Sequence, residues 1–111
     1  MSETPAVPAP VARFVAAINA ADTDAFVAVF ADDGFVEDWG TMYAGPAAVR
    51  RWAGSDAIGA GAQMTILSAS TEGEVTTTRF DWRSRVFTGQ SAGIFTLRGD
   101  EIVGFVIPSG H

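Results

Sequence analysis

An alternating pattern in residues 77–84 constrains the fold of this chain more than any other feature. Arg79 and Asp81 lie at odd positions and alternate with Phe80 and Trp82 at even positions. Because successive side chains of a β-strand point to opposite faces, this pattern predicts a strand with one charged face and one apolar face. We therefore expect a sheet that buries one of its faces.

The second half of the chain continues as runs of strand length that are separated by short turns. We expect strands over residues 62–71, 75–87, 92–99 and 102–108, with turns at 72–74, 88–91 and 100–101. The first half instead carries apolar residues at helical spacing. Helices followed by an antiparallel meander predict an α+β domain, with the helices packed on one face of the sheet.

Three helices are expected before the meander. We expect them to begin at Pro10, at Asp22 or Thr23, and at Pro46, because proline suits the first helical turn and aspartate or threonine caps it. Their apolar stripes place Phe14, Phe26 and Trp52 inward. Two short extended segments, residues 35–38 and 41–45, lie between the second and third helices. Residues 54–61 are expected to form a glycine-rich loop.

Length and charge narrow the class of protein. The chain has 111 residues, a formal net charge of −6 and no cysteine. We expect one domain at residues 10–108 after a flexible arm at residues 1–9. The acidic charge argues against nucleic acid and membrane surfaces as partners, and the lack of cysteine excludes disulfides. Without a signal-peptide pattern or an apolar run of about 20 residues, we expect a soluble, cytoplasmic protein.

A carboxylate in an apolar strand is the most unusual local feature. Asp38 lies two residues after Val36 and directly before Trp39. Because an unpaired charge is costly to bury, Asp38 either ends the strand in water or lies at an apolar pocket for chemistry. It shares a strand face with Val36, which favours the pocket. Desolvation by Trp39 or Trp52 would raise the pKa of Asp38 toward the range that suits a general base.

Three stretches resemble the nuclear-transport-factor-2-like superfamily, in its ketosteroid-isomerase-like and SnoaL-like (polyketide-cyclase-like) branch. They are FVAAINAADTDAFVAVFADD, FVEDWG with YAGPAAVRRW, and GIFTLRGDEIVGFVI. The resemblance covers roughly residues 10–108. It implies a cystatin-like cone, with three N-terminal helices packed on a strongly curved antiparallel or mixed β-sheet. It also implies a pocket at the mouth of the cone, lined by the first helix, the strand with Asp38 and the concave faces of the long strands.

The resemblance to ketosteroid isomerase implies a role for Asp38. In that enzyme a carboxylate at the corresponding position is the general base, and a tyrosine and a protonated aspartate form the oxyanion hole. The positions that resemble these two oxyanion donors hold Phe14 and Phe95. Because phenylalanine donates no hydrogen bond, we expect Phe14 and Phe95 to line the ligand site instead.

A second resemblance is to limonene-epoxide hydrolase, in which an arginine and an aspartate two residues apart hold a water against an epoxide. Arg79 and Asp81 have this spacing, while the position of a further aspartate holds Ile107. Two orientations stay open. Phe80 and Trp82 either fill the monomer core or face a second subunit across the outer sheet face. In the second case Arg79 and Asp81 face into the cone as catalytic residues. We expect a homodimer through the outer sheet face.

The remaining candidates are apolar, and aromatic residues such as Trp52 are also common in a plain core. The expected ligand-binding residues are Phe14, Trp39, Tyr43, Trp52, Phe95 and Ile107. We expect a pocket protein that binds a small apolar molecule and performs acid–base chemistry of the isomerase, cyclase or epoxide-hydrolase type, without a cofactor or metal. The alternative is a non-catalytic ligand-binding or dimerisation domain on the same scaffold.

Overall fold

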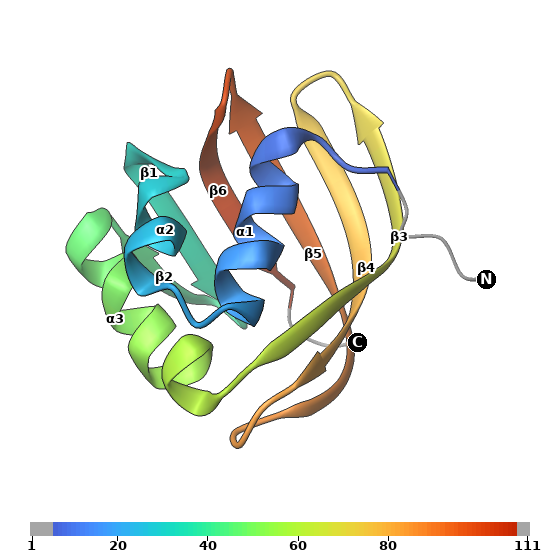
Figure 1. Ribbon diagram of the computed structural model, residues 1–111. Coiled ribbons are helices and arrows are strands. Elements are labelled where there is room, and N and C mark those ends of the chain that lie inside the picture. The colour runs from blue at the N-terminus through green and yellow to red at the C-terminus, as the bar shows by residue number, and fades with distance from the viewer. Residues whose placement is uncertain (1–5, 109–111) are drawn as a thin grey trace.

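The computed structural model describes residues 6–108, in which three helices lie along one side of a sheet (Figure 1). The helices are α1 (Ala9–Asn19), α2 (Thr23–Ala28) and α3 (Pro46–Asp56), and a 3-10 turn, η1 (Ile58–Ala60), follows α3. The strands are β1 (Phe30–Asp38), β2 (Thr41–Ala44), β3 (Gln63–Glu72), β4 (Val75–Arg83), β5 (Thr88–Arg98) and β6 (Glu101–Ile107). No helix within this range has the length and apolarity to cross a bilayer.

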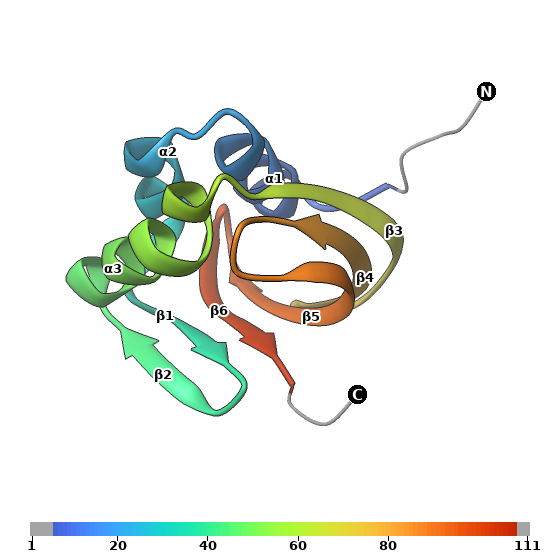
Figure 2. The same cartoon turned by 90° about the horizontal axis from the view of Figure 1, so that it is seen from below.

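The strands form one mixed sheet in the order β2-β1-β6-β5-β4-β3. Neighbouring strands are antiparallel except for β1 and β6, which run parallel. The last strand therefore returns beside the first, and Figure 2 shows β6 between β1 and β5. This pairing sets Asp38 opposite Ile107 at one end of the sheet. The predicted α+β class is confirmed, while the degree of sheet curvature stays a prediction.

Helix α1 forms where its apolar stripe predicts it. Val11, Phe14 and Ile18 are buried, and Pro10 lies in the first turn. Asn19 joins the end of the helix to strand β3, because its Nδ2 donates to the Met64 carbonyl at 2.9 Å and its Oδ1 accepts from the Met64 N–H at 2.7 Å. Within the segment that was expected to be a flexible arm, Val7 packs against the core and Ala9 begins the helix. The rest of that arm, residues 1–5, lies outside the described residues.

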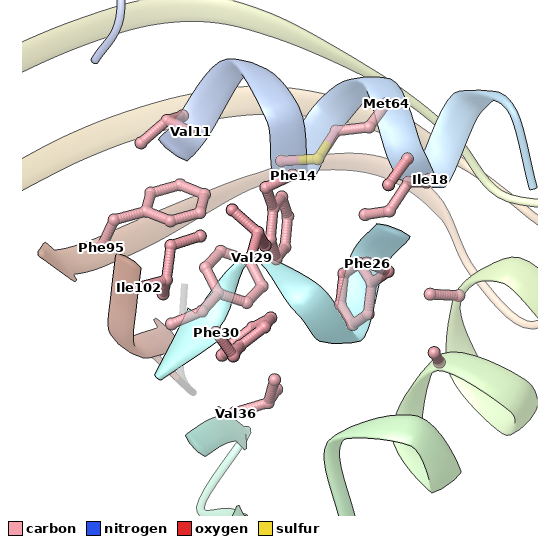
Figure 3. Close-up of a cluster of buried hydrophobic side chains, with 14 of the residues drawn as sticks. Val11, Phe14, Ile18, Phe26, Val29, Phe30, Val36, Met64, Phe95 and Ile102 are labelled. Atoms are coloured by element: carbon pink, nitrogen blue, oxygen red, sulfur yellow. The ribbon is translucent and has the colours of Figure 1, made fainter. Parts of the chain in front are cut away.

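Phenylalanine rings fill the space between α1, α2 and the sheet. Phe14 lies with its ring centroid 5.0 Å from those of Phe26 and Phe95, and 4.7 Å from that of Phe105. Figure 3 shows Phe14 among the labelled side chains of this cluster. Gly93 allows the rings to approach β5, because a Cβ at this position would lie 2.6 Å from the Phe105 ring. These four rings are fully buried.

Strand β4 decides between the two orientations that the sequence leaves open. Phe80 and Trp82 are buried, whereas Arg79, Asp81 and Arg83 are exposed on the outer face of the sheet. An inward orientation of Arg79 and Asp81 is therefore wrong. The physical reason is that the apolar side chains of β4 contact core rings, as Trp82 does with Trp52 at a centroid distance of 6.2 Å. Their burial removes the apolar outer face from which a homodimer was predicted, and the homodimer itself stays a prediction.

Several element boundaries differ from the predictions. Residues 84–87 form the turn after β4, because the Ser84 hydroxyl accepts the N–H groups of Val86 at 3.2 Å and Phe87 at 3.1 Å. Strand β5 consequently begins at Thr88, within the expected turn. Strand β1 begins at Phe30, because the chain enters the sheet beside β6 directly after α2.

Candidate functional site

A cavity of about 220 Å³ opens at the end of the sheet where β1 and β6 stop. Its lining residues are Asp38, Trp39, Trp52, Asp56, Phe80, Trp82, Val86, Phe87, Ser91 and Ile107. They come from strands β1, β4, β5 and β6, helix α3 and the two loops that follow β1 and β4. Helix α1 contributes no lining residue, so its expected place in the pocket wall is wrong. The volume lies below the typical range of about 300–1,000 Å³ for ligand pockets, which suits a compact occupant.

Asp38 lies half-buried in the cavity wall. The indole Nε1–H of Trp52 donates to Asp38 Oδ2 at 3.0 Å. Burial raises the pKa of the Asp38 carboxyl, the Trp52 hydrogen bond lowers it, and the charge and side-chain contact of Asp56 raise it, with a net upward direction. A carboxyl group with a raised pKa is better suited to accept and return a proton near neutral pH.

Helix α3 positions both partners of Asp38. Gly45 precedes the helix with a φ of 89°, a left-handed conformation that favours glycine, and Pro46 begins the first turn. The helix then continues to Asp56, through residues that were expected to be a loop. Trp52 and Asp56 are four positions apart and therefore share one helix face. Sequence reasoning missed Asp56 because the helix was ended too early, although this spacing from Trp52 could have revealed it.

The backbone of Trp39 is strained at the mouth of the cavity. Asp38 pairs with Thr41, so Trp39 and Gly40 form a two-residue hairpin loop, with φ values of 51° and 89°. Positive φ at both loop residues is typical of a type I′ turn, which Asn-Gly forms readily and a bulky residue does not. The tryptophan is 56% exposed and lines the cavity. Strain of this kind is often kept where it positions a functional side chain.

The cavity rim is apolar and the interior carries few polar groups. Val86 and Phe87, which are 62% and 46% exposed, line the cavity together with Trp39. Inside, Ser91 is buried, and the Trp82 Nε1–H donates to the Ser84 hydroxyl at 3.2 Å. An exposed apolar rim around a partly polar hollow is typical of a small-molecule site.

The predicted ligand-binding residues divide into two groups. Trp39, Trp52 and Ile107 line the cavity. Phe14 and Phe95 do not, because their fully buried rings pack edge to face in the core at a centroid distance of 5.0 Å. Tyr43 is half-buried on β2, packs against the core cluster and does not line the cavity. Phe14, Phe95 and Tyr43, which were expected to line the ligand site, therefore do not line this cavity.

The charged side chains at the cavity are of one sign. Asp38 and Asp56 line it, and no arginine among residues 6–108 does. Nor does that range contain a cluster of three or more His, Cys, Asp or Glu side chains that could hold a metal ion. The chemistry available in the cavity is proton exchange by two carboxyl groups, beside an indole N–H and a hydroxyl.

Comparison with known proteins shows the family to which this chain belongs. The model of the SnoaL-like domain matches residues 11–105. No curated protein matches the chain significantly. A solved structure from Sinorhizobium meliloti, assigned as a polyketide cyclase, is 26% identical with a TM-score of 0.80, and the match covers 91% of this chain and 94% of that chain.

Two further solved structures share the fold. A Catenulispora acidiphila protein with a ketosteroid isomerase-like fold, in complex with trimethylamine, is 23% identical with a TM-score of 0.79, covering 92% of this chain and 85% of that chain. The epoxide hydrolase/cyclase-like enzyme SalBIII, described for pyran ring formation in the polyether salinomycin, is 20% identical with a TM-score of 0.81, covering 91% and 88%. With its family model matched from residue 11 to residue 105, this chain belongs to the SnoaL-like domain family.

Proposed function

We propose that the cavity binds a compact, largely apolar molecule and that Asp38 acts on this molecule as a general base without a cofactor. The observation that carries the proposal is the environment of Asp38. Its half-buried carboxyl accepts a hydrogen bond from Trp52 at 3.0 Å, and burial raises its pKa. A general base is most efficient when its pKa lies near the operating pH, and these surroundings move Asp38 in that direction.

The walls and the known relatives favour a reaction class. The rings of Trp39, Trp52, Phe80 and Phe87 supply apolar surface for a ligand without charge. Similar structures are assigned as a polyketide cyclase and described as an epoxide hydrolase/cyclase-like enzyme. We infer an isomerase-, cyclase- or epoxide-hydrolase-type reaction, each of which needs a group that moves a proton. Arg79 and Asp81 are not part of this proposal, because they lie on the outer sheet face.

A second candidate is a non-catalytic ligand-binding domain on the same scaffold. The observation that favours it is the solid core around Phe14 and Phe95, both of which are fully buried. These positions resemble the oxyanion donors of ketosteroid isomerase, and stabilisation of the oxyanion is usually the largest catalytic term. A protein that binds without catalysis would release its occupant chemically unchanged, which native mass spectrometry followed by analysis of the released molecule would detect.

Deuterium exchange tests Asp38 as a base. A panel of small enolisable ketones and epoxides is incubated with the protein in D₂O, and deuterium incorporation or ring opening is followed by NMR and mass spectrometry. For a substrate that reacts, we expect Asp38→Asn to lose about 10²–10⁴ in rate. Glu37→Gln is the matched control, because it removes one charge from the same strand on the other face. An unchanged rate in Asp38→Asn would rule out this assignment.

A further inference from the structure

Two carboxyl groups from different elements meet in the cavity. Asp38 is the last residue of β1 and Asp56 is the last residue of α3. Both line the cavity, and Asp56 lies close enough to Asp38 for its charge and side chain to raise the pKa of the Asp38 carboxyl. Two ionised carboxylates that share one cavity repel each other, whereas a carboxylic acid and a carboxylate attract each other through a strong hydrogen bond.

No basic side chain among residues 6–108 lines the cavity to neutralise this pair. The chain contains no lysine, and the arginines have other partners or point elsewhere. Arg50 pairs with Asp24 at 2.9 Å, and Arg98 pairs with Asp33 at 2.7 Å. Arg13 donates to the Asp100 carbonyl and Arg85 to the Gly59 carbonyl, while Arg51, Arg79 and Arg83 are exposed and line no part of the cavity. The other acidic residue next to the pair in sequence, Glu37, points to the opposite face of β1.

The position of Asp56 is unfavourable for a plain surface charge. The C-terminal end of a helix carries a partial negative charge, so a carboxylate in the last turn of α3 is of the wrong sign. Its Oδ1 lies 2.6 Å from the Ser55 hydroxyl, which holds the side chain in place. The indole N–H of Trp52 donates a hydrogen bond to Asp38 at 3.0 Å. The helix thus provides one hydrogen-bond partner for each of the two carboxyl groups and no cation.

We propose that Asp38 and Asp56 form a proton-sharing pair, in which one proton is held between the two carboxyl groups and Asp56 is the second proton-transfer group of the site. The proton belongs to the pair and not to either residue alone. The proton sharing rests on the cavity that both residues line and on the effect of Asp56 on Asp38, whereas its catalytic use rests on the proposed function of Asp38.

The pair would supply a base and an acid together. The ionised carboxylate takes a proton from a carbon next to a substrate carbonyl, and the electrons of the broken C–H bond move toward the carbonyl oxygen. The neutral carboxyl gives its proton to that oxygen, which yields an enol, and the pair again holds one proton. This arrangement provides the acidic hydrogen-bond donor that Phe14 and Phe95 do not provide.

Carboxyl carbon NMR tests the pair without any ligand. The titration of the Asp38 carboxyl is followed in ¹³C-labelled wild type, Asp56→Asn and Glu37→Gln. In the wild type we expect a curve with two coupled steps and a midpoint above the ordinary value for aspartate. In Asp56→Asn the curve becomes a single step and its midpoint falls, although burial keeps it above the ordinary value. Glu37→Gln should leave the curve unchanged. A thermal melt verifies that each variant is folded, and Asp56→Ala replaces Asp56→Asn if the latter is not.

The outcomes separate this inference from the proposed function. An Asp38 curve that is the same in wild type and in the Asp56 variant would overturn the pair, even if Asp38→Asn still lost deuterium exchange. Coupled titration in a protein that exchanges no deuterium would support the pair and count against the catalytic role of Asp38. If the titration is coupled and the protein also exchanges deuterium, Asp56→Asn should remove one of the two limbs of the pH profile of exchange. A purely structural Asp56 would leave both limbs in place.

Discussion

The two ends of the space between the helices and the sheet use aromatic residues in opposite ways. At the closed end, defined by Phe14, Phe26, Phe95 and Phe105, every ring is fully buried. At the open end, defined by the cavity, Trp39 and Phe87 are 56% and 46% exposed. The difference teaches that aromatic content alone does not indicate a ligand site. A ring packed on all sides contributes to stability, whereas a ring beside a hollow is available to a ligand.

The difference is also one of polarity. No titratable side chain among residues 6–108 is fully buried as the closed-end rings are, whereas Asp38 and Asp56 line the cavity at the open end. Phe14 and Phe95 at the closed end occupy positions that resemble those of the polar oxyanion donors in ketosteroid isomerase. In this chain the polar groups are concentrated at the open end, where solvent can reach them and the cost of burying a charge is lower.

The largest loss of folding stability should follow from removing a ring at the closed end. We expect Phe14→Ala to lower the free energy of unfolding by about 3–5 kcal/mol, because the ring leaves a cavity among its aromatic neighbours. Urea unfolding followed by tryptophan fluorescence measures this loss. Phe87→Ala at the open end is the matched control and should cost only about 0.5 kcal/mol, as for a surface residue. Equal losses in the two variants would contradict the distinction between the ends.

An intermediate effect should come from the carboxylate at the open end. The pKa of Asp38 is raised above its ordinary value of 3.8, so the folded protein binds this proton more tightly than the unfolded chain does. As pH rises from that ordinary value through the folded pKa, Asp38 therefore costs the fold stability, and above the folded pKa the cost is complete. Asp38→Asn removes this cost. Its stability relative to the wild type should rise across that pH window and then level off.

Unfolding in urea at a series of pH values measures this difference. Asp81→Asn on the outer face is a useful reference, because it changes the net charge by the same amount outside the cavity. A stability difference between Asp38→Asn and wild type that falls as pH rises through the window would mean that the carboxyl of Asp38 is not destabilised by its surroundings.

The smallest effect should come from the outer face of the sheet. Arg79→Ala and Asp81→Ala remove exposed side chains from β4, so each should change the free energy of unfolding by about 0.5 kcal/mol or less. Neither should alter deuterium exchange on a substrate of the open end. The measurement is the same exchange assay, with Asp38→Asn as the inactive reference. A strong loss of exchange in either variant would show that the outer face takes part in the chemistry.

The elements on both sides of this contrast could be predicted, but three assignments of residues to the core or the site could not. Phe80 and Trp82 alternate with Arg79 and Asp81, so the pattern separated two faces but did not say which face is inside. Helix α3 was ended before Asp56 because glycine and serine weaken a helix signal. Phe14 and Phe95 were assigned to a pocket wall by resemblance, and the packing of their rings shows otherwise.

Local periodicity by itself determined the helices, the meander, the α+β class and the strand that carries Asp38, because these depend on residues close together along the chain. Tertiary structure alone decided which end of the core is hollow, which face of β4 is buried and that Asp56 lies against Asp38. These outcomes depend on the volumes of side chains brought together from distant segments. Packing of that kind leaves no repeat in the sequence from which it could be read.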